Sequence, residues 1–130
     1  MENRLRYKLK KINIPEEWFF CNPFKSFSEK ILNNLTCKTG VIFFFEEPFK
    51  KKEFLENIEP LVQICRKNRI IFIIQSSFFW ASKYKANGIL IFFKNKFFSN
   101  MINFNLIQDT FLLAVKIHNY QEAQKFAKDI

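Results

Sequence analysis

Two groups of polar residues in this sequence carry side chains suited to proton transfer. Glu46 and Glu47 directly follow a run of apolar residues, and His118, the one histidine in the chain, directly follows another. An imidazole titrates near neutral pH, so His118 could give or take a proton there. Structural roles compete with this chemistry. Carboxylates complement the dipole at a helix start, and a histidine before Asn119 can hydrogen-bond the backbone; we favour the structural role for His118 and leave both open for the glutamates.

A third group combines aromatic and basic side chains. Phe78, Phe79 and Trp80 are followed by Lys83 and Lys85, and aromatic rings beside basic groups can stack the bases of single-stranded nucleic acid. The same three aromatic residues lie in a predicted helix between two buried strands, and we favour packing against the core. The sequence contains no Gly-rich phosphate loop, no metal-spaced cluster of His and Cys, and no Ser or Cys nucleophile motif.

Alternating strands and helices are predicted to position these groups. Short apolar runs rich in β-branched and aromatic residues, bounded by polar turns, are typical of strands buried on both faces. Apolar residues spaced three and four positions apart predict the helices between them. This pattern predicts strands at 18–21, 41–45, 70–74, 89–91 and 111–117, and helices at 26–35, 51–67, 78–85 and 120–128.

Local features add detail to two of the predicted helices and to one loop. Ser26 and Ser28 are available as caps for the first helix, whose buried face would hold Phe27, Ile31 and Leu35. Pro60 would kink or split the long second helix, because proline lacks the N–H that the helix needs. A loop is expected at 94–107.

Five strands alternating with helices indicate an α/β fold made of successive right-handed β-α-β units with parallel strands and flanking helices. Residues 1–17 form a basic N-terminal arm, and residues 18–130 form the (β/α) domain. An open sheet exposes unpaired edges. We therefore expect a homodimer, another partner or the arm to cover those edges.

The centre of the chain also carries a family resemblance. The letters CRKN, an apolar run, Gln75-Ser76, a helix and the letters ANG before Ile89-Leu90-Ile91 resemble the centre of thiamine phosphate synthase and its TenI-like thiazole tautomerase relatives. The segment LLAVKIHNYQEAQKFAKD is similar to the Gly-x-Ser-x-His-x-x-Glu-Glu-Ala segment of that superfamily. The resemblance covers residues 18–130 and implies a truncated, degenerate member, a partial TIM barrel with about five of its eight units.

The resemblance implies a magnesium site that this chain has lost. The synthase joins a pyrimidine pyrophosphate to a thiazole phosphate and holds magnesium with two aspartates. Ser76 and Asn95 stand at those two positions here. Because magnesium favours carboxylate oxygens and substrate phosphates, we expect no metal and no other cofactor.

The pyrophosphate contacts implied by the resemblance are replaced as well. The Gln, Arg and Lys of the synthase correspond to Phe43, Phe45 and Glu47. Replacement of the pyrophosphate-binding Lys by Glu, together with replacement of both metal carboxylates by neutral groups, would be expected to cost several kcal/mol of transition-state binding, at about 1.4 kcal/mol for each tenfold in rate. We therefore expect no synthase activity.

The residues left for a phosphorylated thiazole or pyrimidine are Gln75, Ser76, Asn95 and Lys116, the last standing where the family has serine. In the tautomerase branch, the histidine matched by His118 is implied as the acid–base group.

Length, charge and cysteine content bear on the other classes of function. The 130 residues suffice for one domain with a core, and the formal charge of +9 would suit an acidic partner or nucleic acid. Much of that charge lies in the first 11 residues, and we interpret it as a solvated basic surface, so nucleic acid is not favoured. Three cysteines without a Cys-x-x-Cys motif are typical of reduced thiols, and Cys65 is expected on the buried side of its helix.

No apolar run approaches the roughly 18 residues of a membrane span, and the N-terminus lacks a signal peptide's apolar region. We therefore expect a cytoplasmic protein without a membrane segment. Three hypotheses follow. They are a thiamine phosphate synthase-like protein of thiamine biosynthesis without synthase activity, residual tautomerase-like or phosphate-ligand binding that uses His118, and a basic module that binds an acidic partner or nucleic acid.

Overall fold

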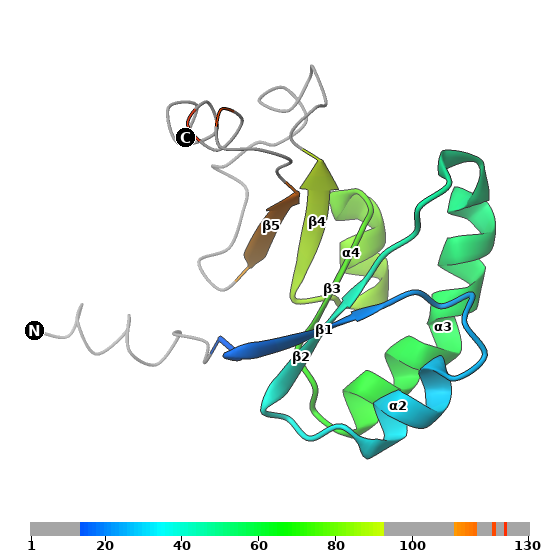
Figure 1. Cartoon of the computed structure of the whole chain (residues 1–130), viewed down its shortest axis with the longest axis vertical. Coiled ribbons are helices and arrows are strands. Elements are labelled where there is room, and N and C mark those ends of the chain that lie inside the picture. The colour runs from blue at the N-terminus through cyan, green and yellow to red at the C-terminus, as the bar shows by residue number, and fades with distance from the viewer. Residues whose placement is uncertain (1–13, 93–110, 117–120, 122–123, 125–130) are drawn as a thin grey trace, which may run out of the picture.

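Five parallel strands form one sheet in the order in which they occur along the chain (Figure 1). The structure is a computed structural model that describes residues 14–92 and 111–116 and positions 121 and 124. The sheet curls into half of a barrel, which confirms the predicted α/β class with partial TIM-barrel-like (β/α) units. Its strands are β1 (Glu17–Cys21), β2 (Thr39–Phe43), β3 (Phe72–Ile74), β4 (Gly88–Phe92) and β5 (Leu112–Lys116).

Three helices, α2 (Ser28–Asn34), α3 (Lys51–Lys67) and α4 (Phe78–Tyr84), lie together on one face of the sheet, as Figure 1 shows. α2 follows β1, the 3₁₀ turn η1 (Pro48–Lys50) and α3 follow β2, and α4 follows β3. In the described chain, no helix is long and apolar enough to cross a membrane.

The apolar spacing in α3 accounts for its position. Its buried side chains recur at three- and four-residue intervals, so they form one stripe that packs on the sheet. Pro60 is exposed and α3 continues through it unbroken, so the expected split is wrong. On the solvent side, water can satisfy the carbonyl that proline leaves without an N–H partner. The buried stripe consists of Phe54, Leu55, Ile58, Leu61, Val62 and Cys65.

The first helix differs from its prediction. α2 begins at Ser28, and its N-cap residue Phe27 makes no side-chain cap hydrogen bond. Instead, the buried Ser28 hydroxyl donates to the Asn22 carbonyl at 2.8 Å and ties the helix to the preceding loop. Because the helix starts later than predicted, its buried face holds Ser28 and Leu32, and Phe27 is 54% exposed.

The two faces of the sheet have different surroundings, because side chains alternate along each strand. On the helix-covered face, Val41, Phe43 and Phe72 join the main core with the helices. On the opposite, inner face, the smaller cluster of Ile42, Ile73 and Leu90 contains no helix residue within the described part of the chain. We call these the outer and inner faces below.

The amino ends of β3, β4 and β5 are joined by one residue. The Asn87 side-chain oxygen accepts from the Phe72 N–H at 3.0 Å, and the Asn87 backbone bonds to Phe72 and to Leu112, each at 2.8 Å. A Cβ on the next residue, Gly88, would collide with the Leu112 carbonyl oxygen. The connection from α4 into β4 therefore needs glycine at position 88.

Within the described chain, β1 and β5 are the edge strands of the sheet, and each pairs with one neighbour. The homodimer or partner expected to cover the sheet edges stays a prediction. Outside the described residues lie Asn95, His118, the loop predicted for 94–107, residues 1–13 of the basic arm, and the helix predicted for 120–128 apart from positions 121 and 124.

Candidate functional site

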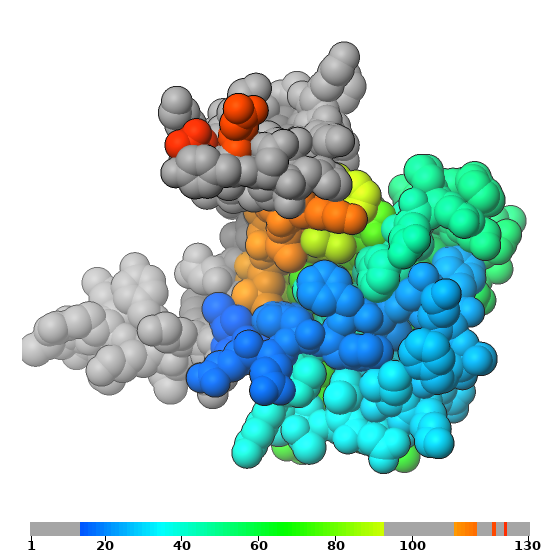
Figure 2. Space-filling view, in the orientation of Figure 1, coloured from blue at the N-terminus to red at the C-terminus, as the bar shows by residue number. Residues whose placement is uncertain are grey.

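A groove of about 700 Å³ opens at the carboxyl ends of the strands. The residues of the inner face that end each strand or follow it supply its lining: Phe20 from β1, Phe44 and Glu46 after β2, Gln75 after β3, Phe92 from β4 and Lys116 from β5. Figure 2 shows β1 (blue), β4 (yellow-green) and β5 (orange) next to one another on this side of the molecule.

The walls of the groove are largely apolar. Ile42 and Leu90 of the inner cluster contribute to its lining. Phe20, 58% exposed, meets Phe44 edge to face with 6.3 Å between the ring centroids and 68° between the ring planes. Such an aromatic pair presents flat, apolar surface against which a planar ring can pack.

Gln75 extends the pairing of β2 and β3 beyond the ends of the strands. Its backbone N–H donates to the Phe43 carbonyl at 3.0 Å, and its side-chain oxygen accepts from the Phe45 N–H at 3.0 Å. The side-chain oxygen is therefore engaged, and the side-chain NH2 is the donor that remains for a ligand.

Lys116 and Phe92 face each other across the last pair of strands. They are register partners in β4 and β5, and the Lys116 Nζ lies 5.2 Å from the centroid of the Phe92 ring. This distance is within the range of a cation–π interaction. Lys116, predicted as an anion contact, thus lies in the groove with its ammonium on an aromatic face.

Ser76, the other predicted ligand residue that the structure describes, is not in the groove lining. Its Oγ is buried and has no hydrogen-bond partner within the described chain. The structure therefore brings Gln75 and Lys116 together in one groove and leaves Ser76 beside it.

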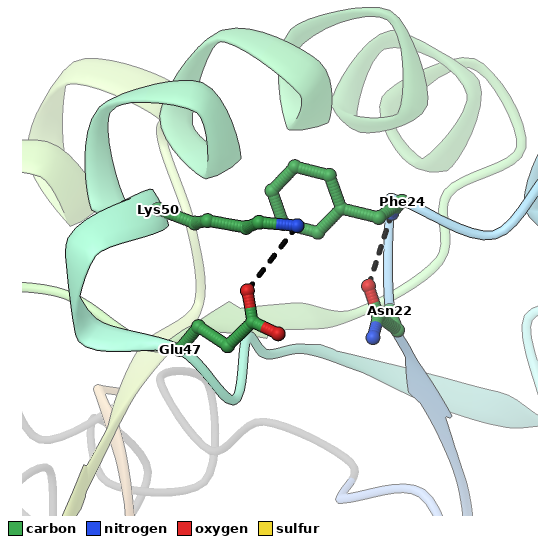
Figure 3. Close-up of polar contacts among 4 residues, drawn as sticks. All are labelled: Asn22, Phe24, Glu47 and Lys50. Carbon is green, nitrogen blue, oxygen red and sulfur yellow. Dashed lines mark hydrogen bonds and ion pairs between the residues drawn. The ribbon is translucent and has the colours of Figure 1, made fainter.

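The two consecutive glutamates separate into two environments. Glu46 lines the groove, whereas Glu47 pairs with Lys50 at 3.2 Å (Figure 3). The Lys50 Nζ also lies 5.2 Å from the Phe24 ring centroid. Glu47 thus helps to hold the loops after β1 and β2 together, and Glu46 is the carboxylate available to a ligand.

At the positions matched to the pyrophosphate contacts, the Phe43 and Phe45 rings both pack into the outer core, whereas Glu47 pairs with Lys50. Phe43 is fully buried on the outer face, with 6.0 Å between its ring centroid and that of Phe72. Phe45 is also buried and packs on Phe54, with 4.6 Å between the ring centroids. Because a shift of one residue along a strand reverses the face, Phe44 is the residue near this strand end that belongs to the inner face.

The aromatic residues of α4 divide between core and surface. Phe78 packs on Phe111 with 5.3 Å between the ring centroids, and Trp80 stacks on Tyr84 at 6.0 Å. Phe78 and Trp80 pack against the core as predicted. Phe79 is 68% exposed, so the prediction of core packing is wrong there, since a one-layer helix contact cannot bury three consecutive side chains.

Two of the three cysteines are inert core residues. Burial raises the pKa of the Cys65 thiol to about 12, with a further contribution from Cys21. Burial also raises the pKa of Cys21 to about 11, against the opposing effect of its hydrogen bond with Ser28. Both thiols are therefore protonated at neutral pH and pack as small apolar groups.

The polar groups around the groove do not fit a magnesium ion. Its described lining offers one carboxylate, Glu46, one amide oxygen already bonded to the backbone, at Gln75, and one ammonium group, at Lys116. Magnesium requires several oxygen ligands, and a lysine ammonium repels it. Within the part of the chain that the structure describes, no three His, Cys, Asp or Glu side chains come together as a metal site.

No protein-family model, no curated protein and no solved structure matches this chain. The family resemblance therefore stays a hypothesis. The sequence reasoning did not single out Phe20, Phe44 and Phe92 as groove residues. The available signal was the two-residue alternation of each strand, continued from its buried residues to its carboxyl end.

Proposed function

We propose that this chain is a thiamine phosphate synthase-like binding domain, related to thiamine biosynthesis, without synthase activity. Its ligand would be a phosphorylated thiazole or pyrimidine held at the carboxyl ends of the strands. The observation that carries the proposal is the groove, in which aromatic walls converge with Gln75 and Lys116.

The position and size of the groove support ligand binding. Proteins built from (β/α) units bind their ligands at the carboxyl ends of the strands, and small-molecule sites have volumes of about 300–1,000 Å³. A heterocycle would pack against Phe20 and Phe44, while the Lys116 ammonium, which is exposed, could turn to a phosphate. The Gln75 NH2 group would donate to the ring or to the phosphate.

The same residues support the absence of synthase activity. That reaction needs magnesium and a bound pyrophosphate, and the groove lining does not fit the ion. At the matched positions, Phe43 and Phe45 are buried apolar side chains and Glu47 is paired with Lys50. A glutamate carboxylate in place of the lysine would repel the negatively charged pyrophosphate.

Thermal unfolding with added ligands tests the binding part of this proposal. Thiazole phosphate should raise the unfolding temperature, since a ligand at 100 times its dissociation constant adds about 2.7 kcal/mol of stability. Lys116→Gln should lose the shift, and Lys83→Gln, on the remote helix α4, should keep it. If neither thiazole phosphate nor the pyrimidine pyrophosphate shifts the unfolding temperature, the binding proposal is overturned.

A turnover assay tests the catalytic part. With both substrates and magnesium, we expect no thiamine phosphate above the uncatalysed rate. Formation of thiamine phosphate that depends on this protein would overturn the claim that synthase activity is lost.

A second candidate function is tautomerase-like proton transfer by His118. The observation that favours it is the position of Lys116, which lines the groove two residues before His118 in the sequence. If His118 is the acid–base group, His118→Ala should abolish turnover of a thiazole carboxylate phosphate without abolishing its binding. Unchanged turnover in that variant would remove this candidate.

A further inference from the structure

The groove already contains a cation resting on an aromatic ring. The Lys116 Nζ lies over Phe92, its register partner on the neighbouring strand. Phe92 is 36% exposed, so part of its ring remains accessible. The π-face of a benzene ring attracts positive charge, and Phe92 is part of the groove lining.

A carboxylate lies in the same groove. Glu46 is exposed and lines it, and within the described residues the ion pair of this loop is made by Glu47 rather than Glu46. Two further aromatic side chains, Phe20 and Phe44, stand in the wall. Aromatic rings with an unpaired carboxylate are the surroundings that stabilise an organic cation.

We infer that the groove selects a planar heteroaromatic cation, which takes the place of the Lys116 ammonium over Phe92 while Glu46 supplies the counter-charge. This inference rests on the proposed function, because it assigns a charge to the ring of the ligand in the same groove. If that ligand carries a phosphate, the displaced Lys116 ammonium is free to bind it.

The net charge of the protein does not oppose this selection. Screening at physiological ionic strength limits charge interactions to about 8 Å for exposed groups. Among the groove-lining residues that the structure describes, Lys116 is the basic one and Glu46 is the acidic one, so their charges balance. Movement of Lys116 away from Phe92 then leaves the carboxylate to face the incoming ring.

A matched pair of ligands separates charge from shape. Isoquinoline and N-methylisoquinolinium have the same fused rings, and at mildly alkaline pH the first is neutral while the second keeps its positive charge. Calorimetric titration of the purified protein should show the cation binding about five- to tenfold more tightly than the neutral ring. Equal affinities, or tighter binding of the neutral ring, would overturn the inference.

Variants with matched controls test the assigned residues. Phe92→Leu and Glu46→Gln should each weaken binding of the cation about three- to fivefold and leave isoquinoline nearly unchanged. Lys116→Met should strengthen binding of the cation, because it removes the internal competitor. Phe79→Leu and Glu29→Gln, which alter an exposed phenylalanine of α4 and an exposed carboxylate of α2, should change neither affinity.

The outcomes distinguish this inference from the proposed function. If thiazole phosphate binds and N-methylisoquinolinium has no advantage over isoquinoline, the inference fails and the proposed function survives. If N-methylisoquinolinium binds with the expected variant effects and neither thiazole phosphate nor the pyrimidine pyrophosphate binds, the inference stands and the proposed ligand class fails. Provided that both variants remain folded, unchanged cation affinity in both Lys116→Met and Phe92→Leu overturns the inference.

Discussion

Phenylalanine side chains lie on both sides of the sheet, but they are buried in the core on the outer side and partly exposed in the groove on the inner side. On the outer face, Phe43 and Phe72 of the strands pack in one core with Phe54 of α3, and all three are almost completely buried. On the inner face, Phe20 and Phe92 stand at the groove with 58% and 36% of their surface exposed. Phenylalanine content therefore does not separate core from site in this chain. The distinction comes from the face of the strand on which each residue lies and from whether a helix covers that face.

The largest expected difference between the faces is in stability. Phe54→Ala should lower the free energy of unfolding by about 3–5 kcal/mol, because it leaves a cavity in a packed core. Phe20→Ala should cost less than about 1 kcal/mol, since much of that ring is already in water. Urea unfolding of both variants measures the contrast. Equal losses would mean that the inner face is as tightly covered as the outer face.

A smaller effect on stability is expected at Gln75, on the inner face just beyond the end of β3. Gln75→Leu removes the acceptor of the Phe45 N–H and should cost about 1–3 kcal/mol, the penalty for a partly buried donor left without a partner. Gln63→Leu, at an exposed position of α3, is the control and should change stability little. If the two variants unfold at the same urea concentration, the Gln75 bond adds no stability.

The smallest expected effect is on the pH dependence of stability, through a buried thiol of the outer core. Folding raises the pKa of Cys65 from 9.0 to about 12, so the folded state holds this proton more tightly than the unfolded state. Its contribution is complete below the unfolded pKa and is lost as the pH rises through the folded pKa. Stability should therefore fall more steeply above about pH 9 in the parent protein than in Cys65→Ala.

Urea unfolding at several alkaline pH values measures that slope, and comparison with the variant cancels the titration of lysines. Equal slopes would mean that Cys65 is not held away from water. In the native protein, a thiol reagent should modify the exposed Cys37 first, because the other two thiols are buried and protonated.

Much of the fold followed from local pattern. The stripe of apolar residues in α3 predicted bounds of 51–67, which the structure matches at both ends. Each of the five strands lies at a predicted apolar run, with ends shifted by up to two residues. Where the reasoning failed, as with Ser28 and Phe27, the helix start depended on a hydrogen bond to Asn22, six residues away, which no cap pattern contains.

The candidate site was predicted less completely. Gln75 and Lys116 were singled out and lie in the groove, whereas Ser76 lies beside it. The aromatic walls were missed, because a run such as 41–45 predicts a buried strand without saying which alternate residues a helix will cover.

By itself, the sequence determined the alternation of strands and helices, because apolar periodicity is a local property that each segment carries along its own length. The need for glycine at position 88, in contrast, comes from the tertiary structure, which brings the Leu112 carbonyl against it. The tertiary structure alone decided that α2, α3 and α4 cover one face of the sheet and not the other. It thereby decided that Phe43 is core while Phe44 and Phe92 form a groove with Glu46 and Lys116. Those side chains come from strands far apart in the chain, and curling of the sheet brings their carboxyl ends together.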